Sequence, residues 1–304
     1  MPSRPPSTFV VSITPFTADG GLDEDGLRVH LRRMRDAGVG VYLAGSGSGE
    51  GYTLDDRETS RVLEIGVEEL RGHVPVRAMG VEPRTPGQMV ALARRAEAAG
   101  VDALQLYSVD AGHGNRPSAQ ELQRYVEEVL AATSLPVVLS THESVGYLLP
   151  AELVAAAVGD ANVIGVNCST DDMTYLTRVV EAVDGRADVH VGGPMHAVTC
   201  LALGGQGFLS SDANLVPHLC AAVIERWQAA DLDGLHVAFE TLLRLHTATR
   251  ELGGLTATKA ALELLGRPAG PPRPPRRPAD EATRVQIRRR IADAVVAANG
   301  IARR

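Results

Sequence analysis

Short apolar segments alternate with amphipathic stretches over the first two thirds of this chain of 304 residues. Eight of these segments are rich in Val, Leu and Ile and too short for buried helices, so we predict strands there. The predicted strands cover residues 9–14, 39–45, 74–80, 103–108, 136–142, 163–169, 188–193 and 205–211. Hydrophobic strands separated by helices are typical of parallel sheets covered on both faces. Eight strand and helix pairs predict an α/β fold that closes as a (β/α)8 TIM barrel, with a doubly wound open sheet as the alternative.

Only helical patterns follow from about residue 213 onward. They cover residues 214–230, 232–251, 256–266 and 280–298. We therefore expect a barrel over residues 1–230 and a C-terminal helical appendage over residues 231–304 that packs on the barrel. The proline-rich residues 271–277 are expected to form a stiff, solvated connector.

Composition narrows the classes of partner. A net charge of −7 and the lack of a basic aromatic stripe argue against nucleic acid. No stretch approaches the roughly 18 uninterrupted apolar residues of a membrane span, and no signal peptide begins the chain, so we expect no membrane partner and a cytoplasmic location. The three cysteines are widely spaced, which fits reduced thiols.

Lysine is almost absent from the sequence. Lys259 is the only one, and arginine supplies the other 29 of the 30 basic residues. A mechanism that needs a lysine amine therefore has one candidate. Because Lys259 falls in the helical appendage, we expect it at the surface or at an interface.

Polar side chains follow most of the predicted strands. In a (β/α)8 barrel the active site lies at the C-terminal ends of the strands and on the loops after them. These positions hold Ser46, Ser48, Glu50, Glu82, Asp110, His113, Ser140, His142, Glu143, Asn167, Asp171, Asp172, Met195, His196, Ser210 and Ser211. The predicted active-site face is thus polar and mostly acidic.

Strand alternation sorts these side chains further, because successive residues of a strand point to opposite faces. Ser140 and His142 share one face of the fifth predicted strand. Along the sixth, Gly165 and Asn167 share a face, and Cys168 takes the other. We therefore expect Asn167 in the barrel mouth and Cys168 outside it, as a buried and inert thiol.

The loop AGSGSGEGYTL, residues 44–54, alternates glycine with serine directly after the second predicted strand. Such a loop leaves backbone N–H groups free to face an anion, and serine hydroxyls add further donors. A small carboxylate or phosphate fits this pattern, although a tight turn before a helix explains it equally well. No GK[ST] follows, so the loop is not a P-loop.

Seven dispersed motifs resemble the dihydrodipicolinate synthase and N-acetylneuraminate lyase family. They are SITPF (12–16), SGSGE (46–50), NRPS (115–118), LPVVL (135–139), NVIGVN (162–167), GGQGFLS (204–210) and TKAALELLG (258–266). They occur in the family's order and span nearly the whole chain. The resemblance implies a (β/α)8 aldolase or dehydratase that binds 2-keto acids at the barrel mouth. It also implies a homo-oligomer, either a tetramer built from tight dimers or a dimer.

The resemblance breaks at the catalytic residues. It implies a Schiff-base lysine at the end of the sixth strand and a proton-shuttling tyrosine at the end of the fifth. The matching positions here hold Asn167 and Ser140. An amide nitrogen is delocalised and cannot attack a ketone as a lysine amine does. In the glycine-rich loop Gly47 replaces the first threonine of the family motif, and Ser48 keeps a hydroxyl at the second.

We therefore predict an enzyme that acts on a small keto or hydroxy acid by acid/base chemistry, of the lyase, hydratase or cyclase type. The predicted catalytic residues are His142, Ser140, Asn167 and Glu143, with His142 as the base. The residues predicted to bind the carboxylate substrate are Ser48, Gly47, Gly49, Glu50, His113 and Ser210. This hypothesis needs no cofactor and no metal.

Two alternatives stay open. One is a noncatalytic homologue that binds a ligand or serves as a scaffold, because the family's lysine and tyrosine are both missing. The other is a metal-assisted aldolase, in which a cation polarises the carbonyl group. Its candidate ligands are His113, His142, Glu143 and His196, or Glu50 and Glu82.

Overall fold

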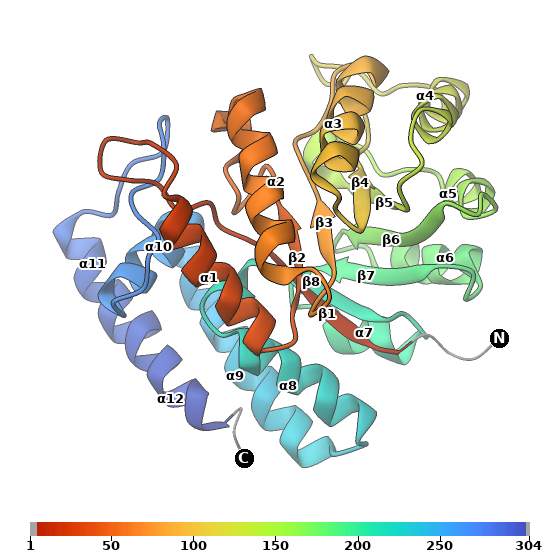
Figure 1. Cartoon of the computed structure of the whole chain (residues 1–304). Coiled ribbons are helices and arrows are strands. Elements are labelled where there is room, and N and C mark those ends of the chain that lie inside the picture. Colours follow the sequence, from red (N-terminus) through yellow and green to blue (C-terminus); the bar gives the residue numbers. More distant parts are fainter. Residues whose placement is uncertain (1–4, 302–304) are drawn as a thin grey trace. The chain divides into compact units, whose positions relative to one another are not determined.

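The computed structural model describes residues 5–301 and contains eight parallel strands that close into one barrel in the order β1 to β8 (Figure 1). The strands are β1 Ser7–Val11, β2 Gly40–Leu43, β3 Val76–Ala78, β4 Ala103–Leu106, β5 Val137–His142, β6 Val163–Ser169, β7 Asp188–Gly192 and β8 Gly207–Ser210. Every predicted strand overlaps one of these, and the prediction for β6 matches at both ends. The predicted barrel is confirmed, and the open-sheet alternative is wrong.

Helices follow the strands, and their starts explain the sequence signals. The helices are α1 Glu24–Asp36, α2 Asp56–Leu70, α3 Pro86–Ala99, α4 Ala119–Ala131, α5 Ala151–Ala157, α6 Met173–Val183, α7 Ala197–Ala202, α8 Pro217–Gln228, α9 Leu232–Glu251, α10 Leu255–Leu264, α11 Glu281–Ile287 and α12 Asp293–Ile301. A π-helical turn, Arg288–Ala292, joins α11 to α12. Asp55 and Ser118 each form a capping box with a glutamate three residues on, which satisfies backbone N–H groups at the helix start. No helix among residues 5–301 is both long and apolar enough to cross a membrane.

The chain forms two compact units. One consists of residues 77–209 together with the short stretch before β1, and the other consists of residues 7–76 and 210 onward. The first holds α3 to α7, and the second holds α1, α2 and α8 to α12. The boundary that we placed at residue 230 stays a prediction.

The strand register decides which side chains share the barrel interior. Ser140 on β5 lies beside Asn167 on β6, and Asn167 lies beside His190 on β7. Paired residues of parallel strands point to the same side of the sheet, so these three form one layer. On the opposite face, burial and the neighbouring Cys200 of α7 raise the pKa of Cys168 to about 12. The predicted outward position of Cys168 is confirmed.

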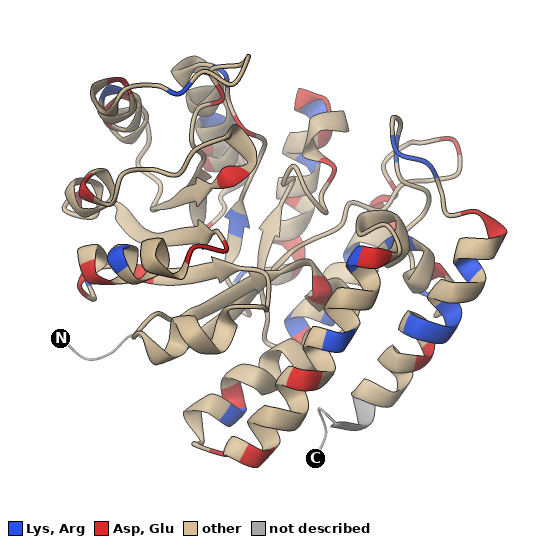
Figure 2. Cartoon of the chain, turned by 180° about the vertical axis from the view of Figure 1, so that it is seen from behind, with Lys and Arg blue, Asp and Glu red and all other residues tan. Residues whose placement is uncertain are grey.

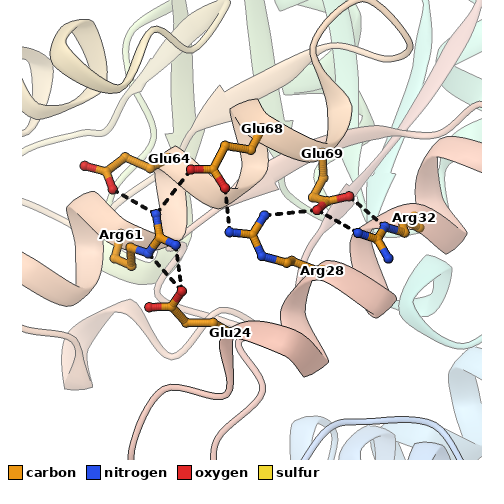
Figure 3. Close-up of polar contacts among 7 residues, drawn as sticks. All are labelled: Glu24, Arg28, Arg32, Arg61, Glu64, Glu68 and Glu69. Carbon is orange, nitrogen blue, oxygen red and sulfur yellow. Dashed lines mark hydrogen bonds and ion pairs between the residues drawn. The ribbon is translucent and has the colours of Figure 1, made fainter.

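Seven charged side chains join α1 to α2 (Figure 3). They are Glu24, Arg28 and Arg32 of α1 and Arg61, Glu64, Glu68 and Glu69 of α2. The guanidinium of Arg61 lies 2.7 Å from the carboxylate of Glu24, and that of Arg28 lies 2.5 Å from Glu68. Exposed ion pairs are weak one by one, but this network shares its members and therefore restrains the angle between the two helices.

Basic and acidic residues are mixed along the C-terminal helices (Figure 2), and two arginines, one of α11 and one of the π-helical turn, pair with glutamates of neighbouring helices. Arg284 pairs with Glu263 of α10 at 3.1 Å, and Arg290 pairs with Glu251 of α9 at 2.5 Å. Their charges serve the packing of the C-terminal helices on one another.

Asn214 ties β1, α1 and the turn after β8 together within the second unit. Its Oδ1 atom accepts hydrogen bonds from the backbone N–H of Ile13 at 3.0 Å and from Nε2 of His30 at 2.9 Å. Its Nδ2 atom donates to the carbonyl groups of Val11 and Ser211. Burial lowers the pKa of His30 to about 3, so His30 is a neutral donor here.

We expect the Asn214→Ala substitution to lower the free energy of unfolding by about 3 kcal/mol, because it leaves several buried donors and acceptors unpaired. Urea denaturation measures this loss. Asn162→Ala is the matched control, since Asn162 is exposed, and it should cost less than about 0.5 kcal/mol. Equal losses in the two variants would contradict the role of Asn214.

Candidate functional site

The predicted site residues divide between the two compact units. His113, Ser140, His142, Glu143 and Asn167 belong to the unit of residues 77–209. Gly47, Ser48, Gly49, Glu50 and Ser210 belong to the other unit.

Asn167 points into the barrel. Its Nδ2 atom donates to Oε1 of Gln105 on β4 at 2.6 Å. Because β5 separates β4 from β6, side chains of these two strands can meet only on the inner face of the sheet. Asn167 is 3% exposed and Gln105 is 2% exposed, so a buried amide pair stands where barrels usually hold branched apolar residues. Gln105 was not among the predicted site residues, although it is the one polar residue of β4.

Ser140 and His190, the neighbours of Asn167 in its layer, are polar, and the buried Arg77 of β3 brings a positive charge near His190. Ser140 is buried on one side, and its backbone carbonyl accepts a hydrogen bond from Ser108 at 3.1 Å. His190 is buried on the other side, where burial and the charge of Arg77 lower its pKa to about 3. His190 is therefore an uncharged imidazole near neutral pH. His190 was also not among the predicted site residues, because strand alternation does not show which inward residues of neighbouring strands lie side by side.

His142 ends β5 and caps the short turn Glu143–Val145. Its Nδ1 atom accepts a hydrogen bond from the backbone N–H of Ser144 at 2.8 Å. The hydroxyl of Ser144 in turn donates to Glu82 at 2.9 Å. Burial lowers the pKa of His142, against the opposing charges of Glu82 and Glu143. Nδ1 therefore cannot take up a proton without losing the bond from Ser144.

The remaining polar residues of this unit do not converge on one point. Glu143 accepts a hydrogen bond from Thr170 at 2.6 Å, which joins the loops after β5 and β6. His196 pairs with the exposed Asp171 at 3.2 Å, and His113 is exposed on the loop after β4. In the described part of the chain, no group of three His, Cys, Asp or Glu side chains could hold a metal ion. No geometry here favours the metal-assisted alternative.

The glycine-rich loop has a backbone that only glycine allows at one position. A Cβ atom on Gly49 would lie 2.7 Å from the backbone nitrogen of Gly45, which is too close for any side chain. The hydroxyl of Thr14 donates to the carbonyl of Gly49 at 2.7 Å, and Gly51 N–H donates to the carbonyl of Gly45. Ser48 is buried within this turn. The loop is therefore rigidly held.

Lys259 anchors the end of that loop, so the expectation of a surface lysine is wrong. The Lys259 side chain is 1% exposed, and its Nζ atom lies 2.5 Å from Oε2 of the fully buried Glu50. The other carboxylate oxygen of Glu50 accepts the backbone N–H of Arg273 at 2.9 Å. Burial lowers the pKa of Lys259, and Glu50 opposes that shift. The Glu50 carboxylate, predicted to bind substrate, is thus occupied by Lys259 and Arg273.

The start of the proline-rich segment packs against the same loop. The Arg273 guanidinium lies 4.1 Å from the centre of the Phe16 ring, and Lys259 Nζ lies 4.3 Å from it. Arg273 also forms two hydrogen bonds with Glu58 of α2. Of the predicted connector, residues 271–277, only residues 274–277 are exposed, so the prediction of a solvated connector is wrong for residues 271–273.

Ser210, the last predicted binding residue, is bound within its own turn. Its hydroxyl donates to Oδ2 of Asp212 at 2.6 Å, and the same oxygen lies 2.8 Å from Nδ1 of His246 on α9. All three side chains are buried. This arrangement ties the end of β8 to α9.

Comparison with known proteins gives a consistent result. Residues 6–294 match the Dihydrodipicolinate synthetase family. The chain is 34% identical to a 4-hydroxy-tetrahydrodipicolinate synthase of Methanopyrus kandleri, over 92% of this chain and 93% of that protein. A protein of the same name from Methanoculleus marisnigri is 32% identical, over 91% and 95%. Among solved structures, YagE, a prophage protein of the dihydrodipicolinic acid synthase family from E. coli K12 in complex with pyruvate, has a TM-score of 0.87 at 26% identity. The alignment covers 97% of this chain and 98% of YagE.

We expect Lys259→Met to lower the free energy of unfolding by about 3 to 5 kcal/mol, because it leaves the Glu50 carboxylate buried without its cation. Urea denaturation measures the loss. The double variant Glu50→Gln/Lys259→Met removes both charges and should recover most of the stability. A double variant no more stable than Lys259→Met alone would contradict the importance of the ion pair.

Proposed function

The chain belongs to the dihydrodipicolinate synthetase family, and on that premise we propose that it acts on a small keto or hydroxy acid without forming a Schiff base. The reaction would be of the lyase, hydratase or cyclase type. The observation that carries this proposal is the side chain of Asn167, which points into the barrel at the position where the family resemblance implies a reactive lysine. An amide there can bind a carbonyl or hydroxyl group but cannot form an imine.

The only lysine of the chain supports the same proposal. Lys259 is buried and paired with Glu50, and its amine also donates to the carbonyl of Pro271 at 3.3 Å. A nucleophilic amine must be neutral and must reach its substrate. Lys259 meets neither condition while this ion pair is intact.

The side chains around Asn167 favour polarisation of a substrate oxygen. Ser140 and His142 share the inner face of β5, and a hydroxyl and an imidazole can both donate hydrogen bonds to an oxygen that gains negative charge. Proton transfer by His142 or Glu143 would complete acid/base catalysis. This set of residues agrees with a lyase that uses no covalent intermediate.

The ligand that we propose is a small-molecule carboxylate. Backbone N–H groups of a glycine-rich turn suit a carboxylate, and Gly47, Ser48 and Gly49 form such a turn. Pyruvate is a suitable probe, because YagE was solved with it. The homo-oligomer, the cytoplasmic location, and the absence of nucleic-acid and membrane partners stay predictions.

A noncatalytic binding homologue is the second candidate. It is favoured by the neutrality of the inner layer, since Ser140 and Asn167 do not ionise near neutral pH and His190 has a pKa of about 3. A panel of keto and hydroxy acids separates the two functions. If the protein binds one of these acids without converting it, the noncatalytic function is favoured. If it converts one of them and Asn167→Ala abolishes the reaction, the enzyme is favoured.

We expect Asn167→Lys to create a Schiff-base site. Burial lowers the pKa of a lysine, so part of the new amine would be neutral and could attack the keto carbon of pyruvate. Borohydride reduction followed by mass spectrometry should detect one reduced pyruvyl group on residue 167 of the variant and none on the unchanged protein.

Asn167→Arg is the matched control, because it adds a cation of similar length that cannot form this imine. Circular dichroism must show that both variants are folded. An adduct on the unchanged protein would overturn the proposed mechanism, and peptide mapping would test Lys259. A folded Asn167→Lys variant that forms no adduct would contradict the placement of residue 167 in a keto-acid pocket.

A further inference from the structure

We infer that the backbone N–H of Ser144 locks His142 as the tautomer with its proton on Nε2, and that His142 acts as a hydrogen-bond donor to a substrate oxygen rather than as the predicted base. The donor role rests on the proposed function, whereas the tautomer follows from the geometry alone.

The bond from Ser144 to His142 identifies the protonated nitrogen. The backbone N–H of Ser144 points at Nδ1 of His142 at 2.8 Å, and an N–H group needs a lone pair to bind. Nδ1 must therefore be unprotonated, which places the proton of the neutral ring on Nε2. Turning the ring over would present a carbon to the N–H group and leave that donor unpaired, so the ring orientation is defined too.

The turn that supplies this N–H is itself held firmly. Gly146 N–H donates to the carbonyl of Glu143 at 2.8 Å, and Gly146 adopts a left-handed conformation with φ of 82° that suits glycine. The Ser144 hydroxyl donates to Glu82, and Glu143 accepts from Thr170. The lock on His142 is thus built from residues of the loops after β3, β5 and β6.

The lock changes what His142 can do. If Nε2 acted as the base, the proton of the neutral ring would have to lie on Nδ1. There it would face the N–H of Ser144, and the two donors would repel each other. A donor at Nε2 needs no such change. Within residues 5–301 no hydrogen bond involves Nε2, and His142 shares its strand face with Ser140. The ligand group that fits is an oxygen acceptor, such as the keto or carboxylate oxygen of a keto acid, and neutral histidine polarises such an oxygen without transferring a proton.

Nitrogen NMR of the full-length protein with ¹⁵N-labelled histidine tests the tautomer near neutral pH without any ligand. The unchanged protein should show the pattern of a neutral ring protonated on Nε2 for His142, assigned by its loss in His142→Gln. A ring protonated on Nδ1 would overturn the inference.

Two substitutions of Ser144 test the lock. Ser144→Pro removes the backbone N–H at the start of a short helical turn, a position that tolerates proline. Ser144→Ala keeps the N–H and removes only the bond to Glu82. We expect a mixture of tautomers in the proline variant and the single Nε2–H tautomer in the alanine variant. If the proline variant does not fold, the spectrum of the unchanged protein still decides the tautomer.

Pyruvate affinity, measured by calorimetry, tests the donor role. Glutamine offers an amide N–H near the place of Nε2–H but cannot act as a base, so His142→Gln should bind within about threefold of the unchanged protein. His142→Ala should bind about tenfold more weakly, the effect of one lost hydrogen bond. Equal weakening in both variants, or none in His142→Ala, would overturn the donor role. If the unchanged protein does not bind pyruvate, the proposed substrate class and the donor role fall together, whereas the NMR result on the tautomer stands.

Discussion

The register in which β5, β6 and β7 pair determines which side chains meet inside the barrel. Parallel strands in register place Ser140, Asn167 and His190 in one layer, and a shift of one residue along any strand would send its member to the helix side. The bond from Asn167 to Gln105 extends that layer across β5 to β4. Because buried polar groups are costly without partners, this hydrogen bond helps to stabilise a polar interior in a fold whose barrels are normally filled with apolar side chains.

The uncharged layer of Ser140, Asn167 and His190 favours one kind of chemistry over another. The family resemblance places an amine and a phenol where this chain has an amide and a hydroxyl, and neither replacement ionises near neutral pH. Burial keeps His190 uncharged as well. Such groups hold and polarise a substrate through hydrogen bonds, and the imidazole of His142 at the end of β5 can act in the same way. There the backbone N–H of Ser144 restricts the imidazole to one protonation pattern.

The sequence predicted what depends on local periodicity. The apolar run of residues 163–169 has a strand's length and composition, and its alternation correctly placed Asn167 inside and Cys168 outside. Local periodicity does not predict contacts between residues that lie far apart in the sequence. Lys259 lies in a helical pattern, and nothing in that pattern indicates that the distant Glu50 would pair with it. The burial of Lys259 could therefore not be predicted. Likewise, the tautomer of His142 depends on one backbone N–H group whose direction is decided by a turn, and residue types alone do not define that direction.

The buried pair of Glu50 and Lys259 shows that the one lysine of the chain is part of the fold. Lys259 donates to Pro271 and faces Phe16, which also stacks with Arg273, so one cation joins α10, the proline-rich segment and the glycine-rich loop. Removing it would leave a buried carboxylate without a counter-charge. Asn167, by contrast, donates to the neutral amide of Gln105. The one lysine of the chain therefore serves the fold at position 259, whereas the uncharged amide at position 167 needs no counter-charge.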